Sequence, residues 1–125
     1  MIVEFDGFSH YKQPEVIKKD YESKLFFENM GYSVVRIPYF IQLSKDAVKV
    51  LFGVELVHEL FDERIPSLGV KGKNTPAFLC GAGVKRMVEE FKLFPEQYKA
   101  NLDFLEQEKD EFLSGASLLR MLHEN

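Results

Sequence analysis

The sequence of 125 residues contains a single cysteine, Cys80, no tryptophan and no long apolar run. One cysteine excludes an internal disulfide framework and any zinc site built from several cysteines. No stretch approaches the roughly 18 apolar residues that a membrane span needs, and no signal peptide opens the chain. We therefore expect a cytoplasmic protein that has no membrane partner.

The chain also has little excess of either charge sign, except near the C-terminus. The formal net charge is −4, and residues 94–125 account for it with three basic against seven acidic side chains. This balance argues against a protein that coats nucleic acid non-specifically, because phosphate binding draws on clustered lysine and arginine. A local nucleic-acid site stays open, since a divalent metal can supply positive charge that side chains lack.

What the sequence does have is enough apolar material for one core. Hydrophobic residues make up 46% of the chain, and twelve of the residues are phenylalanine. A length of 125 residues fits one domain, because domains most often run to about 100–150 residues. The one candidate internal boundary is the loop at 64–75, which is rich in glycine and basic residues. We expect a single domain over residues 1–125.

The first 38 residues predict a strand, a helix and a second strand. Residues 2–6 alternate with period two, as a strand does, and a polar loop follows. A helix is expected from Pro14 to Gly31, and a second strand over 32–37, closed by Pro38. A strand, a crossover helix and a strand imply a parallel pair with a right-handed connection. The predicted fold class is α/β.

The rest of the chain predicts helices. Ser44 is expected to cap a helix over 45–52, and further helices are expected near 54–62, 83–93 and 95–113 and after Gly115. Two strands are too few for a stable sheet. A third strand should therefore come from residues 37–42 or 64–72, or from a second copy of the chain in a homodimer.

Glu4 and Asp6 are the most informative pair of side chains. Being two apart on a strand, they project from one face, with Cα atoms about 6.5–7 Å apart. Two like charges side by side in a core strand are costly unless a cation or a proton compensates them. We expect both carboxylates to bind one metal ion. The alternative is a strand face that is open to solvent.

Four further residues are candidates for the same site. His10 follows the predicted strand after a glycine turn, which brings it near the two carboxylates. Asp20 and Lys24 lie on the stripe of the first helix that should face the sheet; the alternative is an exposed ion pair. Tyr11 could stack on a substrate or simply pack in the core.

Three segments together resemble a known family: Glu4-x-Asp6-Gly7-x-x-His10, Asp20-x-x-x-Lys24 and Gly31-Tyr32-x-x-Val35-Arg36-Ile37. Their order and spacing are similar to the core of the Vsr-like (very-short-patch-repair) endonucleases, which belong to the restriction-endonuclease-like PD-(D/E)xK superfamily. The resemblance covers residues 1–52, under half of the chain. We recognise no family for residues 53–125.

The resemblance implies a DNA endonuclease that hydrolyses phosphodiester bonds with Mg²⁺ or Mn²⁺. It implies catalytic roles for five residues and a metal site at the first two of them: Glu4, Asp6, His10, Asp20 and Lys24. His10 would act near the attacking water or the leaving group, as a general acid or base. DNA would be the partner, contacted by side chains that include the basic group 71–86: Tyr11, Arg36, Lys71, Lys73, Lys85 and Arg86.

One departure from the family pattern concerns the start of the chain. Family members usually have a helix and a strand with a catalytic aspartate before the Glu-x-Asp-Gly strand, whereas Met1 directly precedes that strand here. The resemblance therefore implies a truncated restriction-endonuclease-like core at 1–52, followed by a helical elaboration at 53–125, and an incomplete or weakly active enzyme. The alternative is a catalytically inactive relative that serves as a protein-interaction or DNA-binding accessory module. A small-molecule enzyme on an α/β core is a third hypothesis, but no cofactor motif supports it.

Overall fold

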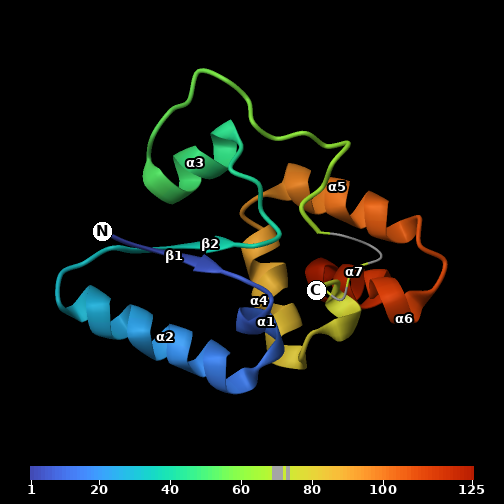
Figure 1. Cartoon of the computed structure of the whole chain (residues 1–125), viewed down its shortest axis with the longest axis horizontal. Coiled ribbons are helices and arrows are strands. Elements are labelled where there is room, and N and C mark those ends of the chain that lie inside the picture. The colour runs from blue at the N-terminus through green and yellow to red at the C-terminus, as the bar shows by residue number, and fades with distance from the viewer. Residues whose placement is uncertain (69–71, 73) are drawn as a thin grey trace.

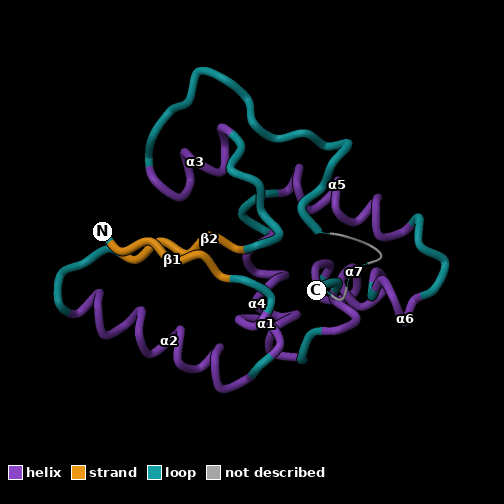
Figure 2. Tube along the Cα trace, in the orientation of Figure 1, coloured by secondary structure: helices purple, strands orange, loops and turns teal. Residues whose placement is uncertain are grey.

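Two parallel strands lie at the centre of the N-terminal half, with helices on either side of them (Figures 1 and 2). The computed structural model describes residues 1–68, 72 and 74–125. Strand β1 (Ile2–Asp6) pairs with β2 (Val34–Pro38), and Ile2 stands opposite Val34. Helix α2 (Pro14–Asn29) connects the two strands. The predicted α/β class and the parallel strand–helix–strand unit are confirmed.

Local signals determine where the crossover begins and ends. Pro14 is the first residue of α2, a position where its missing N–H costs no hydrogen bond. After the helix, Gly31 adopts a φ of +93°, which residues with a Cβ rarely adopt. The chain therefore reverses at Gly31 and runs back beside β1. Two details differ from the prediction: residues Ser9–Lys12, expected in a loop, form the short helix α1, and the second strand, expected over 32–37, is Val34–Pro38.

The remaining elements are helical. Helix α3 (Lys45–Phe52) is capped as predicted, because the Ser44 hydroxyl accepts a hydrogen bond of 3.0 Å from the Ala47 N–H. The other elements are a 3₁₀ turn and four helices: η1 (Pro76–Phe78), α4 (Gly81–Phe91), α5 (Pro95–Glu106), α6 (Glu111–Ser114) and α7 (Ala116–Glu124). Among the described residues, no helix combines the length and apolar character needed to cross a bilayer.

Three predictions about the second half are corrected. Residues 54–62 form no helix, and Val57 is 85% exposed because no apolar surface lies beneath it. The helix expected over 95–113 ends at Glu106, and Asp110 caps the separate helix α6. No third strand forms at 37–42 or in the described part of 64–72; residues 69–71 lie outside the described residues.

The core joins the N-terminal unit to the helices of the second half. The Tyr11 ring packs edge-on against Phe40, with ring centres 5.2 Å apart, and Phe40 lies 4.6 Å from Phe91 of α4. Helix α4 approaches α1 so closely that a Cβ at Gly83 would overlap the Tyr11 carbonyl oxygen. This contact places the next turn of α4 directly beside the C-terminal end of β1.

Candidate active site

Three side chains of types that can ligate a metal converge, from three elements, at the end of β1. Asp6 is the last residue of the strand, His10 lies on α1 and Asp20 on α2. His10 Nδ1 lies 2.6 Å from Asp20 Oδ2 and 3.4 Å from Asp6 Oδ1. One ligand atom from each of the three residues lies within 4.8 Å of the other two, so together they could hold a metal ion. We call Asp6, His10 and Asp20 the acidic centre.

Arg36 of β2 is the first of two guanidinium groups that bind the acidic centre. Its Nη1 lies 2.9 Å from Asp6 Oδ1 and 3.4 Å from Asp20 Oδ1. Its Nη2 also donates a hydrogen bond to the Asp20 carbonyl oxygen at 3.2 Å. Asp6 is fully buried, and burying a carboxylate without a partner would be costly. Arg36 therefore compensates the charge of the strand carboxylate from the neighbouring strand.

Arg86 of α4 is the second guanidinium, and it reaches the centre from the other half of the chain. It donates hydrogen bonds to Asp6 Oδ2 and, at 2.9 Å, to Asp20 Oδ2. It also donates to the His10 carbonyl oxygen at 3.2 Å and to Glu90 Oε1 at 3.1 Å. Both carboxylates of the acidic centre are thus shared between two arginines.

The charges of this cluster shift each other's protonation. Burial alone would raise the pKa of Asp20, but hydrogen bonds from His10 and Arg86 lower it below its ordinary value. Burial raises the pKa of Glu90, although Arg86 and Tyr11 oppose that rise. Burial would lower the pKa of Arg86, but neighbouring acidic groups raise it instead. Asp20 and Arg86 are therefore held in their charged forms.

Two of the predicted catalytic residues lie outside the acidic centre. Glu4 is exposed, so the structure does not bring the predicted Glu4–Asp6 metal pair together; His10 and Asp20 accompany Asp6 instead. Lys24 follows Asp20 by one turn, and its Nζ lies 3.9 Å from Glu28 Oε1, which is the ion-pair alternative.

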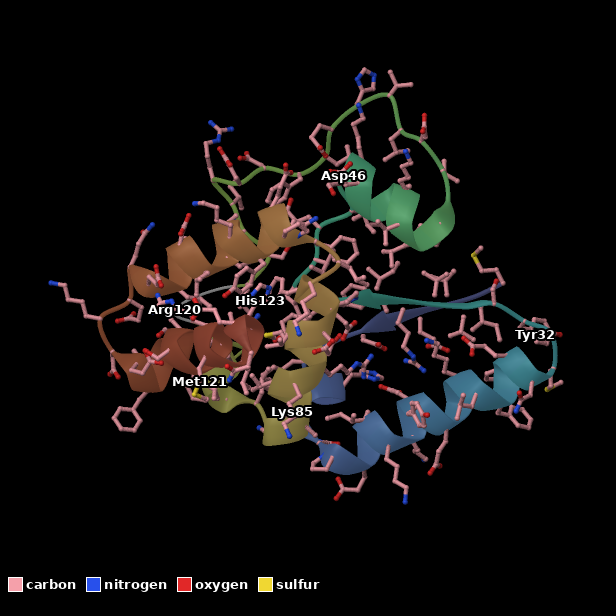
Figure 3. The ribbon with its side chains drawn as sticks, turned by 180° about the vertical axis from the view of Figure 1, so that it is seen from behind. Tyr32, Asp46, Lys85, Arg120, Met121 and His123 are labelled. Atoms are coloured by element: carbon pink, nitrogen blue, oxygen red, sulfur yellow. The ribbon has the colours of Figure 1, made fainter. Side chains whose placement is uncertain are left out.

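The predicted DNA contacts are dispersed. Tyr11 is fully buried, and its hydroxyl donates a hydrogen bond of 2.8 Å to Glu90 Oε1, so it packs in the core and cannot stack on a base. Arg36 and Arg86 bind the acidic centre. Lys85 is exposed on α4 and points away from that centre (Figure 3). Lys71 and Lys73 lie outside the described residues.

Glu90 is the residue of this site that the sequence analysis missed. It lies on α4 and receives hydrogen bonds from Tyr11 of α1 and from Arg86, the arginine of its own helix that binds the acidic centre. The signal was present in the sequence, because Arg86 and Glu90 are four residues apart on a predicted helix and therefore share one face. Nothing in the local sequence indicated that this face would meet Asp6.

Comparisons of the chain with models of protein families, with curated proteins and with solved structures give no match. The geometry of the acidic centre and its two arginines is therefore what supports a function.

Proposed function

We propose that the chain is a metal-dependent DNA endonuclease of the Vsr-like type, built on a restriction-endonuclease-like core, whose reaction centre is Asp6, His10 and Asp20. The observation that supports the proposal is their convergence from β1, α1 and α2 at one end of a parallel strand pair, with two arginines beside them. The resemblance of residues 1–52 to these nucleases implied catalytic roles for these three residues together with Glu4 and Lys24, and a metal site at Glu4 and Asp6.

The chemical types of the side chains in the acidic centre suit a divalent cation. Two carboxylates suit Mg²⁺, and two carboxylates with an imidazole suit Mn²⁺. Asp6 and Asp20 would hold the ion with His10 beside them. An ion in such a site lowers the pKa of a bound water and offsets negative charge on a phosphate. Arg36 and Arg86 already compensate both carboxylates, so we expect weak metal binding that competes with these guanidinium groups.

The chain's own residues are suited to proton transfer and phosphate binding. Asp20 holds Nδ1 of His10 and so fixes the orientation of the ring, which leaves Nε2 to exchange a proton. The side chain of His10 is 27% exposed and therefore accessible to water. Arg36 and Arg86 present planar guanidinium groups, which match phosphate oxygens in geometry and in charge.

Nicking of supercoiled plasmid DNA tests this function. With Mn²⁺ or Mg²⁺ the parent chain should nick the plasmid, and His10→Ala should lose about 10²–10⁴-fold in rate, the usual contribution of a general acid or base. His58→Ala is the matched control, because His58 is exposed on the loop after α3. Nicking that persists in His10→Ala, or that needs no metal, would contradict the proposal.

A second candidate function is a non-catalytic accessory module that binds protein or DNA. The observation in its favour is that Arg36 and Arg86 satisfy the buried carboxylates without any cation. Calorimetric titration with Mn²⁺ separates the two functions, with Asp6→Asn as the background. Heat from the parent above that background supports the enzyme, whereas equal heats for both proteins support the accessory module.

The homodimer expected from the short sheet also stays a prediction. Sedimentation at micromolar concentration should show a species of about twice the mass of the chain. A monomer over the whole concentration range would mean that no second copy adds to the sheet.

A further inference from the structure

The hydrogen bonds between the strands reveal which edge of β2 is unpaired. The Ile2 N–H donates to the Ser33 carbonyl at 2.8 Å, and the Tyr39 N–H donates to the Asp6 carbonyl at 2.9 Å. In a parallel pair these two bonds direct the backbone groups of Val35 and Ile37 toward β1. The backbone N–H and C=O groups of Val34 and Arg36 therefore point to the opposite edge.

Among the hydrogen bonds of the described part of the chain, none joins the backbone of Val34 or Arg36 to another segment. Pro38 supports the assignment of this edge. It occupies the next outward position of β2 in the same register, and proline within a sheet is confined to positions whose N–H would face away from a partner strand. Two N–H donors and their neighbouring carbonyls are thus available along the outer edge of β2.

This edge lies in a groove of about 530 Å³, which is within the usual size range of ligand sites. Figure 1 shows α2 and α3 on opposite sides of the strand pair, and both helices contribute apolar walls. Tyr21 of α2, Val50 of α3 and Leu93 in the turn after α4 line the groove, and each is more than half exposed. We call this space the β2 groove.

The ionisable side chains of the β2 groove cancel one another. Three of those that line it are basic and three are acidic: Lys24, Arg36, Arg86, Asp20, Glu89 and Glu90. Outside the acidic centre and the two arginines that bind it, the groove carries one lysine against two glutamates, so the rest of the groove offers a polyanion such as nucleic acid no net attraction. An uncharged, largely apolar occupant suits the groove better.

We infer that the β2 groove binds an extended apolar segment of a partner polypeptide, which adds to β2 as a third strand. A row of free N–H and C=O groups is complementary to another backbone, and such strand addition is a common mode of peptide recognition. Because α2 and α3 wall the groove on both sides, successive side chains of the segment meet apolar surface in both directions. The preferred segment is therefore a short run of β-branched and other apolar residues, as in a strand buried on both faces. The added strand also brings the sheet to the three strands that stability normally needs.

A display library of random heptapeptides tests the inference. The library is selected on the parent chain and counter-selected on Val50→Lys, which puts a charge into the groove at a half-exposed position where folding tolerates it. Val57→Lys is the matched control, because Val57 is an exposed valine that does not line the groove. We expect apolar, β-branched heptapeptides that bind the parent and Val57→Lys but bind Val50→Lys at least tenfold more weakly.

The best peptide is then synthesised and added to the isotope-labelled chain, and the changes in amide chemical shift show where it binds. The largest shift changes should fall on the amides of Val34 and Arg36. N-methylation of alternate peptide residues removes about two backbone hydrogen bonds and should weaken binding about tenfold in one frame, with little effect in the other.

Three outcomes would overturn the inference. The library gives no peptide enriched over the Val50→Lys target, or both N-methylation frames bind alike, or the peptide shifts amides elsewhere and not those of β2. A labelled single-stranded oligonucleotide that shifts the Val34 and Arg36 amides, where peptides do not, would assign the groove to nucleic acid instead.

Discussion

Asp62 and Arg64 form an ion pair on the surface, with Nε and Nη2 of the arginine each 3.0 Å from a carboxylate oxygen. Arg86 makes similar contacts in the interior, with Asp6 and Asp20. Both arginines donate to carboxylate oxygens, but Arg64 binds one exposed carboxylate whereas Arg86 binds several acidic groups in a buried setting. Water can replace Arg64 around Asp62, whereas Asp6 is fully buried and depends on its guanidinium partners. The comparison therefore predicts that burial, more than contact geometry, decides what an ion pair contributes to stability.

The largest effect is expected from Arg86→Met, which removes a buried partner of two carboxylates. We expect a loss of about 3–5 kcal/mol in the free energy of unfolding, the usual cost of breaking a buried pair. Mn²⁺ should restore part of the loss, because the freed carboxylates of the acidic centre can then bind a cation. Denaturant unfolding with and without Mn²⁺ measures both effects. Arg64→Met is the matched control and should leave the midpoint unchanged; an equal loss in both variants would refute the comparison.

The next effect concerns the approach that brings Arg86 into place. Gly83→Ala puts a Cβ onto the Tyr11 carbonyl, and we expect a loss of about 2–3 kcal/mol as α4 moves away from α1. Gly81→Ala on the same helix has nothing within 4 Å of its new Cβ and should keep the parent stability. Thermal unfolding of the two variants checks this prediction. Equal melting temperatures would show that α4 can shift at no cost.

The smallest effects are the pH dependences contributed by two carboxyl groups, of which Asp20 is the first. Its pKa is lower in the folded chain than in the unfolded chain, so the folded state releases the proton more readily. The stabilisation is complete above the unfolded pKa of about 4 and disappears as the pH falls through the folded pKa. Asp20→Asn should therefore flatten the stability profile below about pH 4. Asp62 also has a lowered pKa, but on the surface, so 1 M salt should abolish its contribution and leave most of that of Asp20. A salt effect of equal size at both sites would contradict this.

Glu90 should show the opposite sign. Its pKa is raised in the folded chain, so its contribution to stability falls as the pH rises from the unfolded glutamate pKa toward the folded value. Glu90→Gln removes this loss. The free energy of unfolding should therefore rise more between pH 3 and pH 7 in the variant than in the parent chain. The same denaturant series, run from pH 3 to 7, measures the change.

The sequence predicted those parts of the fold that depend on neighbours along the chain. The strand over 2–6, the proline at the start of α2 and the Ser44 cap depend on signals within a few residues, and the structure contains each of them. The helix expected at 54–62 had the right spacing of apolar residues. It did not form because an amphipathic face stabilises a helix only when another surface covers it.

For the candidate site, too, the sequence predicted the residues that local structure brings together and missed those that depend on long-range packing. The sequence predicted that Asp6, His10 and Asp20 belong together, because one strand, one turn and one crossover helix bring them to the same end of the sheet. It did not predict that Glu4 would lie outside the centre, nor that Arg86 and Glu90 would complete it. Those contacts span up to 80 positions of the chain and depend on how α4 packs.

The bond between Asp6 and Arg86 also sets an order of events during translation. Arg86 follows Asp6 by 80 positions, so the arginine that will compensate the last carboxylate of β1 has not yet been synthesised when β1 leaves the ribosome. The first half of the protein therefore cannot reach its final form while the second half is still being made. Folding of this chain is completed late, once α4 has emerged.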